Sequence, residues 1–268
     1  MAVTVSAPRP HVGELLRSWR RRRSLSQLEL ALNADVSSRH VSFLETGRAR
    51  PSREMVLHLA EHLDIPLRER NELLLAAGYA PLYLERPLDS ADMASVKRAL
   101  DRFLRAHEPY PAVVLDRRYD LVAANDALGL LLAGVAPDLL EPPANALRVS
   151  LHPRGMAPRI ANLREWSAHL LARLQRRASL TADADLEALH AELAGYPGVS
   201  TDVVHDSGAD IVLPLRLRDD DGGELAFFST ISTFGTANDI TLAELAIEAF
   251  YPADARTANR LLRDVGAA

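Results

Sequence analysis

Apolar residues recur at helical spacing through the first eighty positions of the chain. Five short amphipathic segments are separated by turns, and most are bounded by residues that typically start or stop helices. These segments span residues 12–22, 26–34, 37–46, 53–63 and 66–78. Ser26 and Glu29 have the spacing of a capping box, and Gly47 and Gly78 stand where helices should end. We therefore predict an all-helical domain over residues 11–80.

The pattern changes beyond residue 80. Prolines at 81 and 87 mark a linker over 81–92, and apolar residues return at helical spacing over 92–107. Strand-like sequence, either alternating or rich in β-branched and aromatic residues, follows at 112–115, 121–124, 211–218 and 224–234. Helical sequence between the strands is clearest at 160–177 and 184–193. The pattern predicts a second domain of class α+β over residues 93–268.

Charge is distributed unevenly between these regions. The net charge is −5, yet residues 1–53 hold 10 Arg against 4 acidic residues, a balance of +6. Residues 81–268 hold 19 Lys and Arg against 27 acidic residues, a balance of −8. A basic head on an acidic body favours a polyanionic partner for the head. The run Arg20–Arg23 by itself favours a solvated basic helix face, so the surrounding pattern has to decide.

Residues 25–50 have the spacing of two helices joined by a tight turn. Ala31 is small where the helices should cross, and Val36, Val41 and Leu44 are the apolar positions that hold the second helix. A helix of this kind fits the major groove of DNA. Arg39 is the best candidate for a bidentate contact to guanine, whereas Gln27 and the arginines after the helix suit phosphates. The candidate DNA contacts are Gln27, Ser37, Ser38, Arg39, Ser42, Thr46, Arg48 and Arg50.

These residues resemble the xenobiotic-response-element (XRE) family of regulators, which are related to phage repressors. The likeness is carried by VSFLETGR at 41–48 and RPSREMV at 50–56, and PYPAVVLD at 109–116 and TFGT at 233–236 extend it to the MmyB-like subgroup. The resemblance implies a lambda-repressor-like helix-turn-helix domain followed by a PAS-like ligand-binding domain. The turn departs from the family because Asp35 stands where glycine is usual. Aspartate tolerates a positive φ better than most residues, so the expected fold is unchanged.

The resemblance also implies an apolar pocket for a fatty-acid-like ligand in the second domain. Apolar residues there are numerous enough to line a cavity, but they can equally fill a solid core. Arg154, Arg159 and Arg164 are candidate partners for a ligand carboxylate. The candidate ligand-binding residues are Val114, Arg159, Trp166, Leu170, Leu213, Leu215, Phe227, Phe228 and Phe234.

Three further features have competing interpretations. Phe43 can touch a thymine methyl group or pack against the fourth helix, and we favour packing. His58, Glu61 and His62 spell the inverted zinc-protease signature, but they lie on a predicted helix whose buried stripe is elsewhere, which favours a solvated face. Residues 219–223 are acidic enough to suggest calcium, yet their place between two strands favours a hairpin turn.

The chain contains no cysteine, no phosphate-binding glycine loop and no nucleophile elbow. Its first ten residues lack the apolar core of a signal peptide, and we expect a cytoplasmic protein. We expect a transcriptional regulator without enzymatic activity, cofactor or membrane insertion, which binds double-stranded DNA as a homodimer and responds to a small apolar ligand. The helix at 92–107 is the expected coupling element. Two alternatives stay open: a second domain that serves only protein interaction or dimerisation, and an enzyme with a DNA-binding head.

Overall fold

The computed structural model describes residues 10–181, 183–202, 212–219 and 221–265. The chain divides into two compact units. The first comprises Met1–Glu85 together with Ala237–Ile240, and the second comprises Arg86–Thr236 and Thr241–Ala268. The first border lies inside the predicted linker. Ala237–Ile240 joins the first unit because its backbone pairs with Leu84: the Ile240 N–H donates to the Leu84 carbonyl at 2.8 Å.

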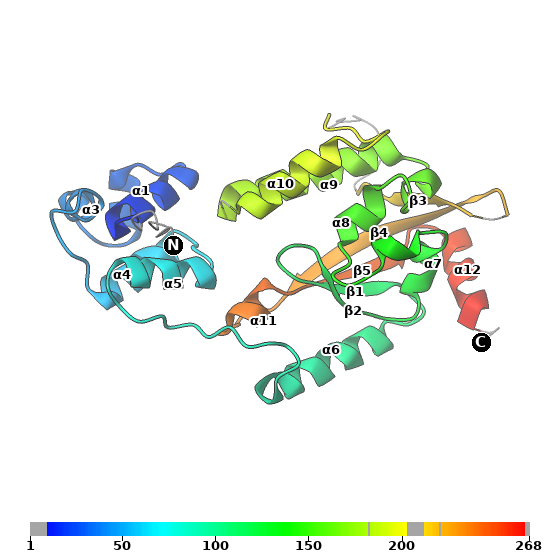
Figure 1. Cartoon of the computed structure of the whole chain (residues 1–268), viewed down its shortest axis with the longest axis horizontal. Coiled ribbons are helices and arrows are strands. Elements are labelled where there is room, and N and C mark those ends of the chain that lie inside the picture. Colours follow the sequence, from blue (N-terminus) through cyan, green and yellow to red (C-terminus); the bar gives the residue numbers. More distant parts are fainter. Residues whose placement is uncertain (1–9, 182, 203–211, 220, 266–268) are drawn as a thin grey trace, which may run out of the picture. The chain divides into compact units, whose positions relative to one another are not determined.

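The first unit is helical in its described residues (Figure 1). Its helices are α1 (Val12–Arg22), α2 (Gln27–Asn33), α3 (Ser38–Glu45), α4 (Arg53–His62) and α5 (Leu67–Ala76). The predicted capping box is confirmed, because Ser26 Oγ accepts from the Glu29 N–H and the Glu29 carboxylate accepts from the Ser26 N–H. Ser37 caps α3 in the same way by accepting from the His40 N–H at 3.1 Å. Local hydrogen-bonding chemistry therefore sets where these helices begin.

The core of the first unit forms where the apolar stripes of the helices meet. Leu16, Leu44, Leu59 and Leu73 are essentially inaccessible to solvent. Gly13 lies where α1 crosses α3, and a Cβ at this position would collide with the carbonyl oxygen of Leu44. The two backbones are therefore in contact, which holds α3 firmly against the body of the unit.

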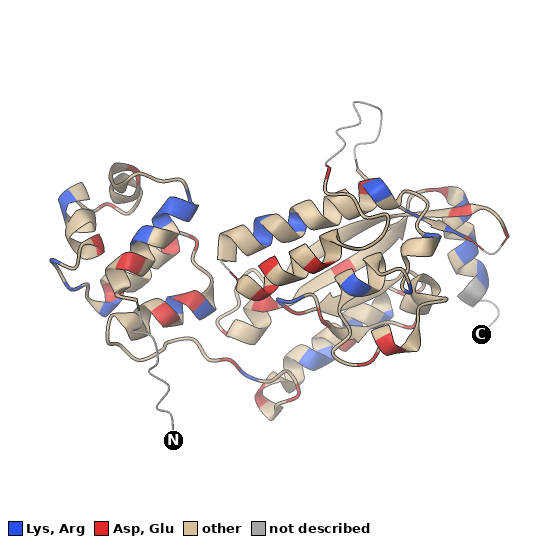
Figure 2. Cartoon of the chain, turned by 45° about the horizontal axis from the view of Figure 1, so that its top comes forward, with Lys and Arg blue, Asp and Glu red and all other residues tan. Residues whose placement is uncertain are grey.

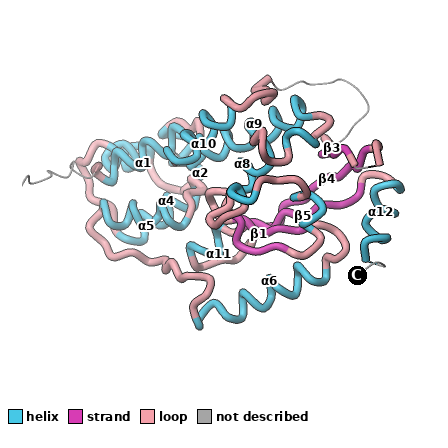
Figure 3. Tube along the Cα trace, turned by 45° about the vertical axis from the view of Figure 1, so that its right-hand side comes forward, coloured by secondary structure: helices cyan, strands magenta, loops and turns pink. Residues whose placement is uncertain are grey.

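The second unit combines an antiparallel sheet with helices, as the tube in Figure 3 shows. Its strands are β1 (Ala112–Leu115), β2 (Leu121–Ala124), β3 (Leu215–Arg218), β4 (Glu224–Thr233) and β5 (Ala246–Pro252), in the order β2-β1-β5-β4-β3. Its helices are α6 (Ala94–Ala106), α7 (Leu128–Leu132), α8 (Ala146–Leu151), α9 (Leu163–Thr181), α10 (Ala184–Ala194) and α12 (Ala255–Val265), and α11 (Ile240–Glu244) begins at the border between the units. This is an α+β, PAS-like fold.

The two faces of the sheet belong to different hydrophobic clusters. Val113 and Leu115 of β1 and Phe250 of β5 join the cluster that includes α9 and α10. Val114 and Ile247 lie in a separate cluster with the apolar residues of α6. Successive side chains of a strand point to opposite faces, so the central strands serve both clusters.

The predicted elements agree with the structure in part. β1 and β2 have the predicted bounds, and the Asp219 N–H donates to the Gly223 carbonyl, as expected for the hairpin turn predicted between β3 and β4. The strand expected over 211–218 starts only at Leu215, and Ile211 lies outside the described residues. β5 escaped prediction because its alanines and glutamate are weak strand formers. No helix in the described part of the chain is long and apolar enough to span a bilayer.

Candidate functional site

The outward face of α3 carries three of the eight side chains predicted to meet DNA. Ser38 and Arg39 are exposed and Ser42 is half-buried, whereas Val41 and Leu44 are buried against the rest of the unit. Thr46, the residue that ends α3, is exposed, and its hydroxyl donates to the Ser42 carbonyl at 2.7 Å. Helical spacing therefore separates one polar face from one apolar face, as the sequence predicts.

Phe43 lies differently from our expectation. It does not belong to the hydrophobic cluster in which α4 takes part, and it stays half-buried on the surface. The guanidinium carbons of Arg39 and Arg48 lie 5.1 and 5.9 Å from the centre of its ring. Cations prefer this position over an aromatic face, so the ring gathers both arginines next to the outward face of α3.

A buried ion pair that the sequence pattern does not indicate holds α3 in place. Arg20 of α1 and Glu45 of α3 are only 8% and 6% exposed. Arg20 donates from Nε and Nη2 to the two Glu45 carboxylate oxygens at 2.6 and 2.9 Å, and from Nη1 to the Leu25 carbonyl at 2.7 Å. Gln27 of α2 donates to the same carboxylate at 2.8 Å. Three helices of the unit are thus linked through Glu45.

The environment of this pair favours its charged form. Burial opposes ionisation of Glu45, but the hydrogen bonds from Arg20 and Gln27 outweigh it and hold the pKa of the carboxyl below its ordinary value. The hydrogen bonds to Glu45 likewise raise the pKa of the Arg20 guanidinium. The negative charge of Glu45 is therefore stabilised by partners within the first unit.

Two other predicted DNA contacts have partners within the first unit. The side chain of Gln27 is directed to Glu45, and Gln27 itself is the first residue of α2. Arg50 donates from Nη2 to the Ala77 carbonyl at 3.0 Å and lies over the ring of Tyr79. Both side chains thus have a structural role, and their contact with phosphates stays a prediction.

The arginine run at 20–23 divides into structural and exposed members. Arg23 donates to the carbonyls of Leu63 and Asp64, which ties α1 to the end of α4, whereas Arg21 and Arg22 are exposed. Figure 2 shows acidic and basic residues interspersed on the helices of the first unit, and Glu14 lies in the first turn of α1. The basic surface of the unit is therefore smaller than the sequence count suggests.

The histidines of the zinc-protease pattern have backbone partners. His58 Nε2 lies 2.7 Å from the Ala34 carbonyl, and His62 Nδ1 lies 2.9 Å from the His58 carbonyl. Among the residues that the structure describes, no group of three or more potential ligands is arranged to hold a metal ion. The two imidazoles are thus explained as parts of the helical surface.

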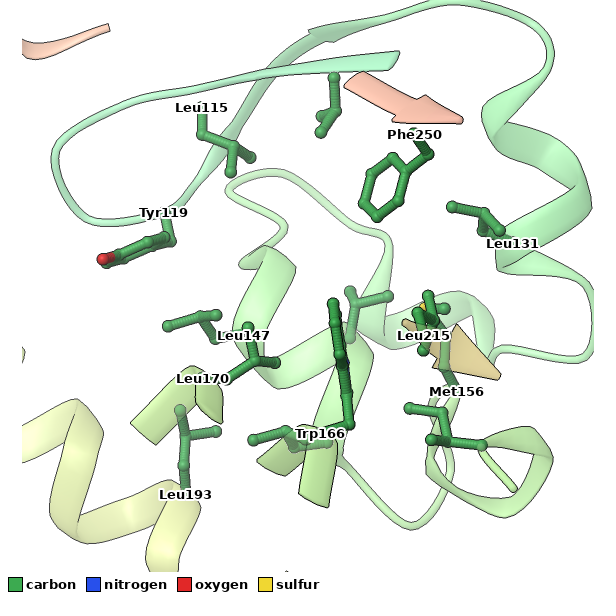
Figure 4. Close-up of a cluster of buried hydrophobic side chains, with 14 of the residues drawn as sticks. Leu115, Tyr119, Leu131, Leu147, Met156, Trp166, Leu170, Leu193, Leu215 and Phe250 are labelled. Atoms are coloured by element: carbon green, nitrogen blue, oxygen red, sulfur yellow. The ribbon is translucent and has the colours of Figure 1, made fainter. Parts of the chain in front are cut away.

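The second unit contains a cavity of about 70 Å³ on the α9 side of the sheet. Figure 4 shows Phe250, from β5, and Trp166, from α9, directed into the same space. The indole N–H of Trp166 donates to Ser150 Oγ at 3.2 Å, so the ring has a fixed orientation. Most lining residues are apolar, and they come from β1, β2, α7, α8, α9, β3 and β5 and the segment after α8: Val113, Leu115, Leu121, Leu128, Leu131, Leu132, Ala146, Leu147, Val149, Ser150, Met156, Trp166, Leu170, Arg173, Leu215, Glu248 and Phe250.

Three of the nine predicted ligand-binding residues line this cavity, namely Trp166, Leu170 and Leu215. Phe227 and Leu213 belong to the surrounding hydrophobic cluster without lining the cavity. Val114 does not line the cavity as predicted, because it lies on the opposite face of the sheet. Its neighbours Val113 and Leu115 face the cavity instead.

Phe228 and Phe234 are corrections of the same kind. Phe228 stacks on Tyr251, and Phe234 packs against the cluster on the α6 side of the sheet. Phe228 lies away from the cavity because adjacent residues of a strand face opposite sides, and Phe234 lies just beyond the end of β4.

The arginines predicted to meet a carboxylate also lie elsewhere. Arg159 donates to the carbonyls of Leu131 and Ala133 at the end of α7, at 3.2 and 2.9 Å. Arg154 pairs with Asp138 on the surface, and Arg164 is exposed. None of the three lines the cavity, because Arg159 binds backbone carbonyls, Arg154 binds a surface carboxylate and Arg164 is exposed to solvent.

The charged groups of the cavity are Arg173 of α9 and Glu248 of β5. Arg173 Nη2 lies 3.4 Å from Glu248 Oε2, and Ser229 donates to Glu248 Oε1 at 2.9 Å. The Glu248 side chain is 8% exposed and that of Arg173 is 24% exposed. The sequence signal for this pair is Glu248 itself, the one acidic residue within the apolar run 246–250. A carboxylate in such a run is expected to be buried and therefore to need a partner.

Comparison with known proteins agrees with this division of the chain. Residues 11–73 match the helix-turn-helix domain family, and residues 96–263 match the ligand-binding domain of MmyB-like transcription regulators. No curated protein matches the chain significantly.

One solved structure, described as an RNA-binding light-oxygen-voltage receptor, aligns with 96% of this chain at 13% identity and a TM-score of 0.30. The alignment covers 64% of that receptor, and a score this low does not establish a shared fold. The match to residues 96–263 by itself takes in more than half of the sequence, and a helix-turn-helix domain precedes it. The chain therefore belongs to the MmyB-like transcription regulators.

Proposed function

We propose that this protein is a sequence-specific transcriptional regulator that binds double-stranded DNA as a homodimer. Each copy places α3 in a major groove, and the two recognition helices lie about 34 Å apart, one helical turn of DNA. The observation that carries the proposal is the exposed polar face of α3, which the Arg20–Glu45 pair fixes to α1 and α2. The protein acts in the cytoplasm, inserts into no membrane and has no enzymatic activity of its own.

Arg39 is the residue we assign to base recognition. It is exposed near the start of α3, and its guanidinium rests on Phe43 without a carboxylate partner among the described residues. A guanidinium in this position can donate two hydrogen bonds to O6 and N7 of guanine. Phe43 is available for a thymine methyl group, because it takes no part in the core. Ser38, Ser42 and Thr46 complete the face, and Arg48 neutralises backbone phosphates.

The test compares two arginine substitutions on a preferred duplex selected from random sequence and on its scrambled form. Arg39→Ala should weaken binding to the preferred duplex by about 1–3 kcal/mol, or about 5- to 150-fold, and leave the scrambled duplex nearly unaffected. Arg48→Ala should weaken both duplexes similarly. Arg164→Ala, at an exposed position of α9, is the matched control. Equal losses on both duplexes for Arg39→Ala contradict the assignment.

We further propose that a small apolar ligand of fatty-acid type binds in the cavity and controls DNA binding. The lining supports a ligand with an apolar body, and Arg173 is the cation available at its edge for a carboxylate. The contact of 3.4 Å between Arg173 and Glu248 is long for a charge-assisted hydrogen bond, so a ligand carboxylate can compete for the guanidinium. A cavity of about 70 Å³ is below the usual size of ligand pockets. The ligand must therefore displace lining side chains, and this rearrangement is the signal.

The fluorescence of Trp166 gives a direct measurement of ligand binding, because the indole lines the cavity. Titration with saturated fatty acids and with the alcohols of equal length separates the roles of chain and headgroup. Arg173→Met should weaken acid binding about tenfold, which corresponds to about 1.4 kcal/mol, and leave alcohol binding unchanged. Arg154→Met, on the surface beside Asp138, is the control. Absence of binding by every acid and alcohol would favour a second domain that serves interaction or dimerisation alone.

A further inference from the structure

Strand β4 extends well past the strand that pairs with it. β3 pairs only with Glu224–Phe227, whereas β5 follows β4 on its other side as far as Thr233. Six residues, Phe228–Thr233, therefore have a partner strand on one side, and none of the described residues pairs with them on the other. Among the described residues, no backbone hydrogen bond reaches this outer edge.

The other edges of the sheet are covered by the chain itself. Beside β2, the Leu121 N–H donates to the Ala144 carbonyl at 2.8 Å. Beside β3, the Ala161 N–H donates to the Arg216 carbonyl at 2.8 Å, and Ile160 forms a bridge with Leu217. Soluble proteins protect strand edges in this way because a free edge pairs readily with other chains. The outer edge of Phe228–Thr233 is the exception within the described sheet.

The side chains of this segment do not protect the edge. Thr230, Ile231, Ser232 and Thr233 are exposed in succession, although a strand with one covered face alternates between buried and exposed residues. Ile231 leaves 48% of its surface in solvent. The segment FSTIST contains no charged residue and no proline, the residues that usually prevent edge pairing. Within the part of the chain that the structure describes, both faces and one edge are thus exposed and chemically suited to another β-strand.

We infer that this edge pairs with the same edge of a second copy of the chain. Antiparallel pairing of identical strands is compatible with a two-fold axis normal to the sheet, so the contact closes as a dimer. An axis at Ile231 brings the two Ile231 side chains together, and it pairs Thr230 with Ser232 and Ser229 with Thr233 of the copy. These pairs contain no like charges, which a self-contact must avoid. The inference rests on the proposed function, because two-fold DNA sites require a two-fold protein.

The absence of cysteine makes a single introduced cysteine a specific reporter of this contact. Residues directly opposite in antiparallel strands have Cα atoms about 4.5–5.5 Å apart, within the range that a disulfide bridges. Ile231→Cys in the full chain should therefore form a covalent dimer under mild oxidation. Leu180→Cys, which replaces an exposed residue of α9, is the matched control and should form at least tenfold less dimer.

The second measurement is the molar mass of the unmodified chain and of Ile231→Lys by sedimentation without DNA. We expect a dimer for the former and a monomer for the latter, because the substitution places two ammonium groups opposite each other. A monomeric unmodified chain, or a dimer that Ile231→Lys leaves intact, overturns the inference. Equal cross-linking at positions 180 and 231 overturns it as well. Sequence-specific DNA binding that persists after such a result leaves the proposed function standing and places the dimer contact elsewhere.

Discussion

Replacement of Arg20 by methionine should destabilise the DNA-binding unit far more than replacement of any exposed arginine of that unit. Arg20 is 8% exposed, and its guanidinium makes three hydrogen bonds, two of them to the Glu45 carboxylate. Methionine retains much of the packing volume but leaves Glu45 buried with Gln27 as its remaining side-chain donor. Removing one member of a buried ion pair costs about 3–5 kcal/mol.

This loss is large compared with the stability of a small domain. The free energy of unfolding of such domains is about 5–15 kcal/mol, so a loss of about 3 kcal/mol removes a large part of it. In a unit of this size each kcal/mol shifts the melting temperature by about 4–8 °C, which predicts a decrease of about 12–24 °C. The second unit should melt as before, because the pair lies entirely within the first unit.

The two tryptophans allow the units to be followed separately. Trp19 lies in α1 and Trp166 in α9, so a Trp166→Phe background leaves fluorescence that reports on the first unit. Thermal unfolding of Arg20→Met is compared there with Arg21→Met, whose side chain is exposed. The double substitution Arg20→Met with Glu45→Met should reduce the free energy of unfolding by less than the sum of the two single substitutions, because it leaves no unpaired buried charge. A loss below about 1 kcal/mol for Arg20→Met refutes the reasoning.

Two further predictions concern the same helices. The pKa of Glu45 is held below its ordinary value, so its contribution is present above about pH 4.5 and is lost as the pH falls through the lower folded value. The melting temperature of the first unit should therefore fall more steeply on acidification in the unmodified chain than in Glu45→Gln. Parallel profiles of melting temperature against pH for the two proteins contradict this. Gly13→Ala should destabilise the first unit by about 1–3 kcal/mol, since the added methyl group meets the Leu44 carbonyl. Gly129→Ala, where a Cβ meets nothing, is its control, and equal stability of the two variants excludes the close crossing.

The described elements of the first unit could be predicted closely because their signals are local. Ser26 and Glu29 form the capping box within four residues, and Asp35 takes a φ of 49° in the turn between α2 and α3. The family usually has glycine at this position, and aspartate can replace it because aspartate tolerates a positive φ better than most residues. These effects depend on neighbours in the chain, so the sequence shows them directly.

The cavity could not be predicted in the same detail. Val113 and Val114 are both buried, at 5% and 0% exposure, because helices cover both faces of the sheet. Burial on both sides removes the alternation of polar and apolar residues that would show which residue faces which cluster. The choice of Val114, Phe228 and Phe234 therefore rested on residue type alone.

The sequence by itself determined the positions of the helices in the first unit, the polar face of α3 and the change to an α+β second unit, since hydrophobic period and capping act over short distances. Only the tertiary structure decided which distant residues meet. Arg20 and Glu45, and Arg173 and Glu248, are 25 and 75 residues apart and pair only when separate elements pack together. Among the described residues, the edge of β4 beyond Phe227 is likewise open because β3 begins only at Leu215. Long-range pairing depends on how whole elements pack, and this information is spread over the entire chain.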